Sequence, residues 1–217
     1  MADLPKDWTK LYSAVVSDSL DAAGLLHQAL PASIRPLDDS LLLCGRARTG
    51  IYMETAHVEP GSNPYALEIK LIDDLAAGEV AVLACGGSQR IAPWGGMLST
   101  AAKARGAAGC VTDGFVRDIK VIRRLGLPAF HAGIAPLDSK GRGEIRAIDV
   151  PVICAGVRVE PGDLIVGDAD GVVVVPKTRE AEVLALAFDK INREDSSMVE
   201  LANGAYLRDV YARYGVL

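Results

Sequence analysis

Short apolar runs and helical segments alternate through the middle of the chain. Residues 80–84 form a short apolar run that predicts a buried strand, and residues 110–112 predict a further strand. Between them, residues 96–105 place small side chains at helical spacing, and residues 118–125 predict a second helix before another apolar run. This succession of strand and helix from residue 80 to 131 predicts an α/β fold with a parallel portion in its sheet.

The pattern changes after residue 133. Residues 138–146 are charged and contain glycine, and we expect a loop there. Short β runs follow, separated by turn sequences at residues 161–163 and 168–171. These runs span residues 150–154, 157–159, 164–166 and 172–175. Turns at such short intervals predict antiparallel or barrel-like strands.

The N-terminal part of the chain contains a helical pattern and then a β pattern. Residues 9–26 show helical spacing, and Ser17 is the expected N-cap of a short helix that ends at the glycine after residue 23. Residues 41–53 predict one or two strands, because Gly45 and Gly50 interrupt the apolar run.

Three further helices are expected. Residues 65–75 fit a helix with Pro64 at its first position. Residues 178–192 form an amphipathic pattern, and a last helix is expected over about residues 197–214. The inner side of the amphipathic helix is predicted to carry Val183, Leu184, Leu186 and Ala187. Since no repeat, low-complexity segment or linker interrupts the sequence, we expect residues 1–217 to form one domain.

Composition narrows the class of protein. The chain has 217 residues, of which 50% are hydrophobic and 24% charged, as in ordinary folded proteins. A net charge of -5 argues against nucleic acid as a partner, because phosphate binding needs a basic surface. No apolar run approaches the roughly 20 residues that a membrane-spanning helix needs, and the first ten residues lack a secretory signal. We therefore expect a cytoplasmic protein that binds neither nucleic acid nor membrane.

The cysteines do not form a metal-binding or disulfide pattern. They are scattered along the chain without a Cys-x-x-Cys pair, and three of them lie in apolar runs. We expect reduced side chains in the core. The four residues are Cys44, Cys85, Cys110 and Cys154.

The most suggestive chemistry lies between residues 86 and 133. There an apolar run ends in a glycine turn that presents Arg117 next to Asp118. A guanidinium can hold a carboxylate through two parallel hydrogen bonds. A carboxylate is a hard ligand for Mg²⁺ or Mn²⁺, and Mg²⁺ often uses only one or two carboxylates, with water and substrate completing the shell. The glycines at 95 and 96 precede a helix, so free amides there could hold a second anionic oxygen.

Taken alone, an adjacent arginine and aspartate are more often surface charges than a site, and other candidates are weaker still. His27, His57 and His131 have no local partner, so a structural role is the simpler interpretation. Asp18 and Asp21 lie near an expected helix start, where acidic residues commonly serve the helix dipole.

Three segments together resemble the RraA-like family. This family includes class II 4-hydroxy-4-methyl-2-oxoglutarate and 4-carboxy-4-hydroxy-2-oxoadipate aldolases, and the regulator of ribonuclease E activity. The resemblance covers nearly the whole chain and implies an α/β fold of the swivelling β/β/α type, with a barrel-like mixed sheet flanked by helices. It also implies homotrimers, or homohexamers built as dimers of trimers. The segments are WGGMLSTAAKARG at residues 94–106, DGFVRD at 113–118 and VEPGDLIVGDADGVVVVP at 159–176.

The resemblance implies specific roles for residues of this chain. Arg117 would bind the carboxylate of a small 2-oxo acid substrate, together with backbone amides of the segment that includes Gly95, Gly96, Met97 and Leu98. Asp118 would ligate Mg²⁺ or Mn²⁺, and Glu194, from a neighbouring subunit, is the nearest match to an acid that supports the metal through water. The implied reaction is retro-aldol cleavage that releases pyruvate, and the same chemistry would permit oxaloacetate decarboxylation.

The chain departs from the family pattern at two positions. The aldolases carry an aspartate 21 positions before the arginine, where this chain has Gly96. Many members carry an acid where this chain has Val121. The missing acid at residue 96 leaves the general base unassigned, and Asp113 and Glu68 are conceivable replacements.

The family also leaves a second function open. A non-catalytic protein that binds and regulates ribonuclease E is the alternative to an enzyme. Retention of Arg117 and Asp118 favours the enzyme, because a protein that only binds another protein does not need a metal-site pair.

Overall fold

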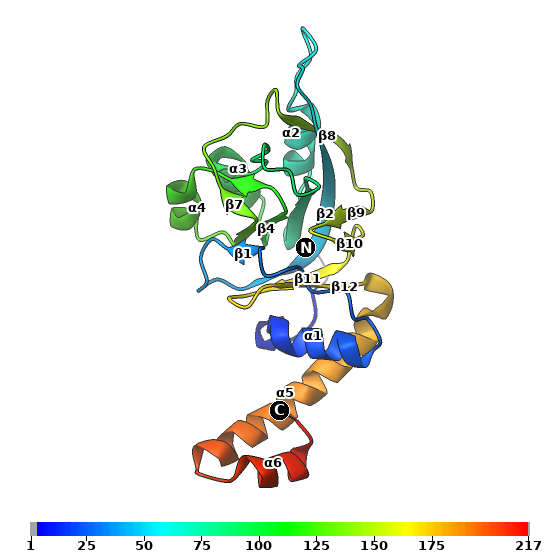
Figure 1. The fold of residues 1–217 in the computed structure, drawn as a ribbon, viewed down its shortest axis with the longest axis vertical. Helices are drawn as coiled ribbons and strands as arrows, with labels where there is room; N and C mark the ends of the chain where they lie inside the picture. Colours follow the sequence, from blue (N-terminus) through cyan, green and yellow to red (C-terminus); the bar gives the residue numbers. More distant parts are fainter. Residues whose placement is uncertain (1–3, 217) are drawn as a thin grey trace.

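A curled, mixed sheet forms the centre of the computed structural model, which describes residues 4–216 (Figure 1). Residues 1–3 and 217 lie outside it, so part of the N-terminal stretch that we searched for a secretory signal lies outside the described residues. The strand order is β1-β6-β4-β3-β2-β11-β12, and β8 pairs with the far part of β2. Helices flank this sheet, as the mixed α/β prediction requires (Figure 1).

The predicted parallel portion is present. It contains β2 (Leu43–Glu54), β3 (Glu79–Ala84), β4 (Gly109–Thr112) and β6 (Ala129–His131), which run parallel to one another. The chain passes between the last three through α3 (Gly96–Ala104) and α4 (Ile119–Leu125). Strand and helix therefore alternate as the apolar pattern predicts, and the carboxyl ends of these strands meet at one edge of the sheet.

The remaining strands are mostly antiparallel, which confirms the prediction for the second half of the chain. Strand β11 pairs with β2 and β12, β1 pairs with β6, and β9 and β10 form a hairpin. Strands β5 and β7 form a separate parallel pair. The bounds are β1 (Arg35–Pro36), β5 (Phe115–Val116), β7 (Gly133–Ile134), β8 (Gly143–Ile148), β9 (Val152–Cys154), β10 (Val157–Val159), β11 (Leu164–Gly167) and β12 (Val172–Val175).

Two expectations about strands were wrong. The loop predicted over residues 138–146 ends early, because β8 begins at Gly143 and pairs with β2. Strand β2 also continues through both glycines that we expected to interrupt it. Gly45 is required by close packing, since a Cβ there would lie 2.6 Å from the carbonyl oxygen of Gly78. The glycine reflects crowding within the sheet, and the strand does not break there.

The described part of the chain contains α1 (Ser13–Ala22), α2 (Ala66–Asp73), α5 (Glu180–Ala202) and α6 (Leu207–Tyr214), besides α3 and α4. Short 3₁₀ turns cover Trp8–Lys10 and Lys177–Arg179. In Figure 1, α2, α3 and α4 lie beside one part of the sheet, α1 lies below β11 and β12, and α5 runs away from the body with α6 folded back beside it. None of these helices is long and apolar enough to cross a membrane.

The helix boundaries correct three predictions. Helix α1 begins at Ser13, so Ser17 lies inside the helix and does not cap it. Helix α5 continues to Ala202 and α6 begins only at Leu207, so the break expected between residues 192 and 197 is absent; the hydroxyls of Ser196 and Ser197 bond to carbonyls one turn earlier within the same helix. Leu186 was placed on the inner side of this helix, but it is 37% exposed.

The core is divided by the sheet. One cluster packs α2, α3 and α4 against a sheet face through residues such as Leu71, Ala102 and Leu83. A second lies under the β9–β10 hairpin, and a third packs α1 and α5 on β11 and β12. The four cysteines are buried and free, as expected. Burial raises the pKa of the Cys44 thiol to about 12, so this side chain is held as a neutral core residue.

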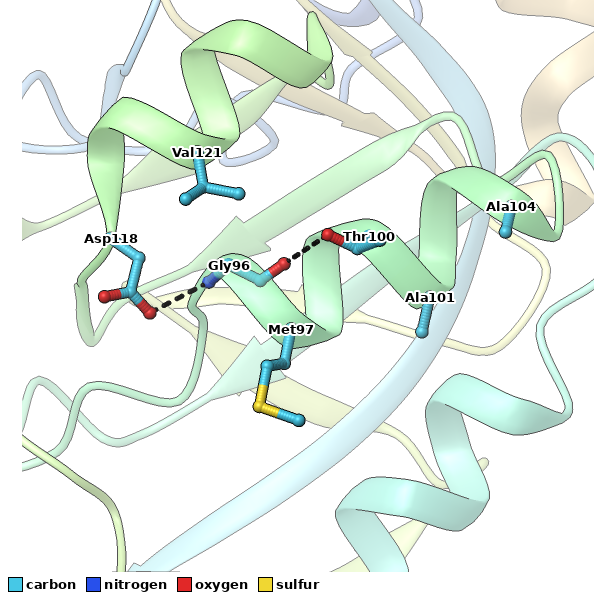
Figure 2. A pocket seen from close by; sticks show the side chains of 7 residues that line it. All are labelled: Gly96, Met97, Thr100, Ala101, Ala104, Asp118 and Val121. Carbon is cyan, nitrogen blue, oxygen red and sulfur yellow. Dashed lines mark hydrogen bonds between the residues drawn. The ribbon is translucent and has the colours of Figure 1, made fainter.

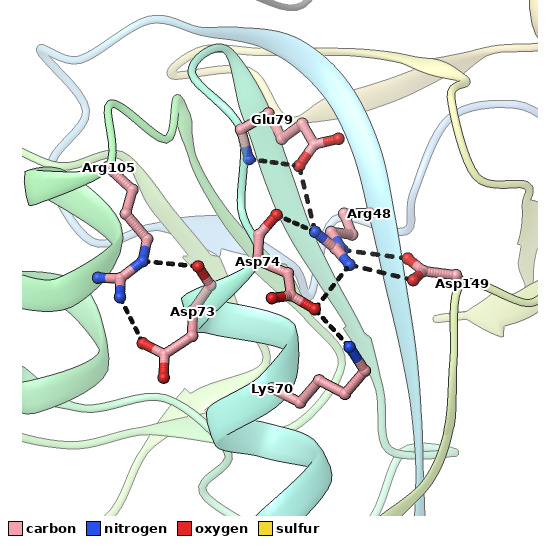
Figure 3. Close-up of polar contacts among 8 residues, drawn as sticks. Arg48, Lys70, Asp73, Asp74, Glu79, Arg105 and Asp149 are labelled. Carbon is pink, nitrogen blue, oxygen red and sulfur yellow. Dashed lines mark hydrogen bonds and ion pairs between the residues drawn. The ribbon is translucent and has the colours of Figure 1, made fainter.

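An ion-pair network attaches the C-terminal end of α2 to the sheet (Figure 3). Arg48 on β2 pairs with Asp149, 3.1 Å away, and lies 3.8 Å from both Asp74 and Glu79. From the end of α3, Arg105 donates to Asp73 at 2.5 Å. Helices α2 and α3 are thus fixed to each other and to the sheet, and both contribute residues to the largest group of site candidates.

Candidate active site

A pocket of about 320 Å³ lies between α2, the N-terminus of α3 and the turn that follows β5. Arg117 and Asp118 both line it, and so do the glycines that precede α3. The predicted substrate-binding residues therefore meet in one place, although they come from separate segments. The lining residues are Tyr65, Glu68, Ile69, Ala92, Pro93, Gly95, Gly96, Met97, Leu98, Arg117, Asp118 and Ser139.

Asp118 is held in an unusual backbone conformation at the start of α4. Its φ is 59°, in the left-handed region, where aspartate is tolerated better than most residues. Its Oδ2 accepts a hydrogen bond from the backbone N–H of Gly96 at 3.1 Å (Figure 2). The side chain remains 51% exposed, so the carboxylate is oriented by the protein and still open to a ligand.

The two glycines before α3 make room for this arrangement. A Cβ at Gly95 would lie 3.0 Å from Oδ2 of Asp118 and 3.2 Å from Nε of Arg117. A Cβ at Gly96 would lie 3.2 Å from both Asp118 and Val121. Figure 2 shows Val121 on α4 facing Gly96, beside a shallow hollow that continues along α3. Any side chain at either position would crowd the arginine and aspartate pair.

Arg117 is positioned from two sides. Its Nη1 donates to the carbonyl oxygen of Leu137 at 3.2 Å, and its Nη2 lies 3.7 Å from Oδ1 of Asp138. Its Nε lies 3.9 Å from Oδ2 of Asp118. The hydroxyl of Tyr65 holds Asp138 in turn, by a 2.8 Å hydrogen bond. The guanidinium is thus oriented with 38% of its side chain exposed, which leaves it able to take an anionic ligand.

The first turn of α3 offers backbone donors beside these side chains. Gly96 donates to Asp118, while the N–H groups of Met97 and Leu98 have no acceptor in the described part of the chain. Unpaired amides at a helix N-terminus favour an anion. The pocket therefore combines a guanidinium, two backbone donors and a carboxylate.

Glu68 is a second carboxylate in this pocket. Its Oε2 accepts a 2.5 Å hydrogen bond from the hydroxyl of Tyr52, and Ser139 lies 3.5 Å away. Burial raises the pKa of Glu68, and the nearby charge of Asp138 acts in the same direction, while the bond from Tyr52 opposes them. The sequence offered no positional reason to connect residue 68 with residue 117, because the contact arises from packing of α2 beside α3.

Asp113 is not available for chemistry. Its carboxylate is 4% exposed and accepts hydrogen bonds from the backbone N–H groups of Cys85, Gly87 and Ala155, the last at 3.1 Å. These bonds connect the turn after β3 with the β9–β10 hairpin. Of the two replacements considered for the missing acid, Asp113 therefore has a structural role and only Glu68 lines the pocket.

Glu194 does not meet Asp118 within one chain. It lies in the middle of α5, where it accepts a hydrogen bond from Tyr12 and lies 3.6 Å from Lys190. Figure 1 places α5 well away from α3 and α4. The sequence-based placement of Glu194 beyond the end of the amphipathic helix was also wrong, since α5 extends past it.

Among the described residues, Asp118 and Glu68 are the only Asp, Glu, His or Cys side chains that line this pocket, and no group of three such side chains that could hold a metal ion is present. The three histidines lie outside the pocket: His131 is buried, and His27 and His57 are exposed. A single half-exposed carboxylate fits a hard cation whose shell is completed by water and substrate.

Comparison with known proteins identifies the family of the chain. Residues 13–174 match the family model RraA-like, described as Aldolase/RraA. The chain belongs to the RraA-like family. The match spans every element that contributes to the pocket, from α2 to the segment that contains Ser139.

Two relatives are similar to this chain in sequence, and one solved structure is similar in fold. A protein of Halalkalibacterium halodurans, provisionally named a 4-hydroxy-4-methyl-2-oxoglutarate aldolase, is 39% identical over 175 residues, which are 81% of this chain and 77% of the relative. A 4-hydroxy-4-methyl-2-oxoglutarate aldolase of Thermus thermophilus is 34% identical over 152 residues, 69% of this chain and 85% of its own. The structure of Streptomyces coelicolor RraAS2, described as an unusual member of the RNase ES inhibitor RraA protein family, superimposes with a TM-score of 0.79 at 32% identity, covering 89% of this chain and 95% of its own.

Proposed function

We propose that this chain is a divalent-metal-dependent aldolase that cleaves a 4-hydroxy-2-oxo acid, such as 4-hydroxy-4-methyl-2-oxoglutarate, and releases pyruvate. The observation that carries the proposal is the meeting of Arg117, Asp118 and the free amides of α3 in one pocket. The names of the two relatives support an aldolase. We propose oxaloacetate decarboxylation as a second reaction of the same pocket.

Arg117 would bind the carboxylate of the 2-oxo acid. Its planar fork suits a carboxylate, and its contacts to Leu137 and Asp138 fix its direction. The N–H groups of Met97 and Leu98 would share the negative charge of the same group. Together, the guanidinium and the two N–H groups form a carboxylate clamp. This clamp would place the 2-oxo carbon of the substrate next to Asp118 and exclude substrate orientations in which the reacting bond points away from it.

Asp118 is the residue proposed to hold Mg²⁺ or Mn²⁺. The hydrogen bond from Gly96 engages only Oδ2, and half of the side chain is exposed. When bound, such a cation supplies Lewis-acid stabilisation of negative charge on the substrate's oxygens. Arg117 and the helix amides would add to that stabilisation as charge develops during cleavage.

We propose that a second copy of the chain completes the site in a trimer, or in a hexamer made of two trimers. Glu194 cannot reach Asp118 from its own chain, so it could support the cation only from a neighbour. Helix α5 extends from the body, and its outer half carries exposed Met198 and Val199. A protruding helix with exposed apolar side chains is suited to contact another subunit.

A second candidate function is regulation of ribonuclease E by direct binding. The likeness to RraAS2, described as belonging to an RNase inhibitor family, favours it. The two candidates make different predictions. An inhibitor would act on the ribonuclease without needing Asp118 or a divalent cation, whereas an aldolase needs both.

The test is pyruvate release from 4-hydroxy-4-methyl-2-oxoglutarate and from oxaloacetate, with Mg²⁺, with Mn²⁺ and with excess EDTA. Turnover that requires the cation supports the aldolase. A folded protein without turnover on both substrates, but with inhibition of ribonuclease E, would replace the enzyme with the regulator. For variants of the pocket carboxylates, Glu59→Gln is the matched control, since Glu59 is an exposed carboxylate outside the pocket.

A further inference from the structure

The proposed reaction needs a group that accepts a proton, and this chain lacks the aspartate that the family's aldolases carry at the position of Gly96. In retro-aldol cleavage the proton of the C4 hydroxyl must leave before or as the C3–C4 bond breaks. Asp118 is assigned to the cation and Arg117 remains charged. The inference below rests on the proposed function and concerns which residue performs this proton transfer.

We infer that Glu68 is the general base of this pocket, and that it accepts the proton of the substrate's C4 hydroxyl. Its side chain lines the pocket that holds Arg117 and Asp118. Only Oε2 has protein partners, namely Tyr52 and Ser139. Oε1 has no hydrogen-bond partner within residues 4–216, so it can accept a proton from a ligand in the pocket.

A glutamate in the first turn of a helix often serves only the helix dipole. Glu68 differs from that simpler case in the direction of its side chain. Instead of extending into solvent, the carboxylate bonds to the hydroxyl of buried Tyr52 on β2 and approaches Ser139 on the opposite wall. A dipole role would not require these contacts.

The surroundings of Glu68 raise its pKa above the ordinary value of a glutamate. The groups that face it are Tyr52 on β2, Tyr65 at the start of α2, Cys85 after β3, Arg117, and Asp138 on the loop before β8. Burial and the charge of Asp138 raise the pKa of Glu68, whereas Tyr52 and Arg117 limit the rise. A base is most effective when its pKa lies close to the working pH.

The helix that carries Glu68 is held at its C-terminal end. The C-terminal end of α2 is fixed to β2 by Arg48 and to α3 by Arg105 (Figure 3). The same α3 carries the amides that face Arg117. The base and the carboxylate clamp are therefore placed by two helices that are tied together, as proton transfer requires of groups that act on one substrate.

The C4 hydroxyl proton passes to Oε1 of Glu68, the C4–O bond becomes a carbonyl, and the C3–C4 bond breaks. The electron pair of that bond forms the enolate of pyruvate, which Arg117 stabilises by its charge and the helix amides stabilise by hydrogen bonding. The proton then returns from Glu68 to C3, which gives pyruvate and restores the carboxylate.

The experiment compares two reactions of the same protein. Retro-aldol cleavage needs a base at the C4 hydroxyl, whereas oxaloacetate has no hydroxyl to deprotonate and loses carbon dioxide directly. Glu68→Gln keeps the size of the side chain and an oxygen that can accept from Tyr52. We expect it to lower kcat for cleavage by about 10²- to 10⁴-fold, while decarboxylation stays within about tenfold of the wild type. Glu59→Gln should leave both reactions unchanged.

The pH profile separates proton transfer from a structural effect. The acidic limb of kcat/KM for cleavage should disappear in Glu68→Gln, and Glu68→Asp should recover part of the rate with that limb restored. Equal loss of both reactions, or unchanged cleavage, would overturn the role of Glu68 and leave the aldolase intact. Absence of both reactions in the wild type would overturn the aldolase, and this role with it.

Discussion

The backbone N–H of Gly96 donates to the carboxylate of Asp118 at 3.1 Å, and this contact joins the first turns of α3 and α4 (Figure 2). It fixes the carboxylate next to the guanidinium of Arg117. The contact depends on two backbone features: the absence of a side chain at Gly96 and the left-handed conformation of Asp118.

The left-handed backbone at Asp118 predicts different costs for two substitutions. Asn tolerates this conformation and keeps an oxygen that can accept from Gly96, whereas Ala does neither. Asp118→Asn should stay within about 0.5 kcal/mol of the wild-type unfolding free energy, and Asp118→Ala should lose about 1–2 kcal/mol. Urea unfolding measures both. Equal stability of the two variants would contradict the argument.

An aspartate at residue 96 should destabilise the protein. Its Cβ would lie 3.2 Å from atoms of both Asp118 and Val121. We expect Gly96→Asp to cost about 1–3 kcal/mol through overpacking. Adding Val121→Ala should recover about 0.5–1 kcal/mol, because it removes the contact with Cγ1 of Val121, while the contacts with the Cβ atoms of residues 118 and 121 remain.

A double-mutant cycle of thermal or urea unfolding measures this coupling, with Val121→Ala alone as the reference. Additive effects of the two substitutions would show that Val121 does not resist a side chain at residue 96. We expect a non-additive result, in which Val121→Ala costs less stability when residue 96 is aspartate than when it is glycine.

Asp113 should be important for stability. Its buried carboxylate accepts from the backbone N–H groups of Cys85, Gly87 and Ala155, and removing it leaves these donors without a partner. Asp113→Ala should lower the unfolding free energy by about 2–4 kcal/mol. Asp39→Ala, at an exposed site, should change it by less than about 0.5 kcal/mol. A small effect at residue 113 would contradict the structural role.

The raised pKa of Glu68 predicts a specific pH dependence of stability. The folded protein binds this proton more tightly than the unfolded chain, whose glutamates titrate near 4.5. The contribution of Glu68 to the unfolding free energy is therefore greatest below pH 4.5 and is lost as pH rises through the folded-state pKa. Wild type should lose stability relative to Glu68→Gln across that window. A difference that stays constant, or changes in the opposite direction, would contradict a raised pKa.

The fold was largely predictable because its signals are local. The strands and helices between residues 80 and 131 each have a short apolar run or a helical spacing of their own, and the glycines at their ends mark the turns. The extent of α5 was not predicted, because its amphipathic pattern was followed only to residue 192, whereas the polar and serine-containing turn that follows, with Ser196 and Ser197 bonded back within the helix, is also helical. Strand β8 was missed because its pairing with β2 is long-range.

The site was predictable only in part. Arg117 and Asp118 are adjacent in sequence, so their meeting needed no tertiary information. Glu68 and Ser139 enter the same pocket from segments that no sequence spacing connects to residue 117. Asp113 is a candidate acid by sequence alone. In the structure its carboxylate accepts hydrogen bonds from three backbone N–H groups, so it has a structural role.

The central claim is that Asp118 supports metal-dependent cleavage of a 4-hydroxy-2-oxo acid. The most direct test is the rate of pyruvate release from 4-hydroxy-4-methyl-2-oxoglutarate at saturating Mg²⁺, in wild type and in the folded Asp118→Asn variant. We predict turnover in the wild type that EDTA abolishes, and a loss of about 10²-fold or more in the variant. Equal rates in the two proteins, or wild-type turnover that survives EDTA, would contradict the account.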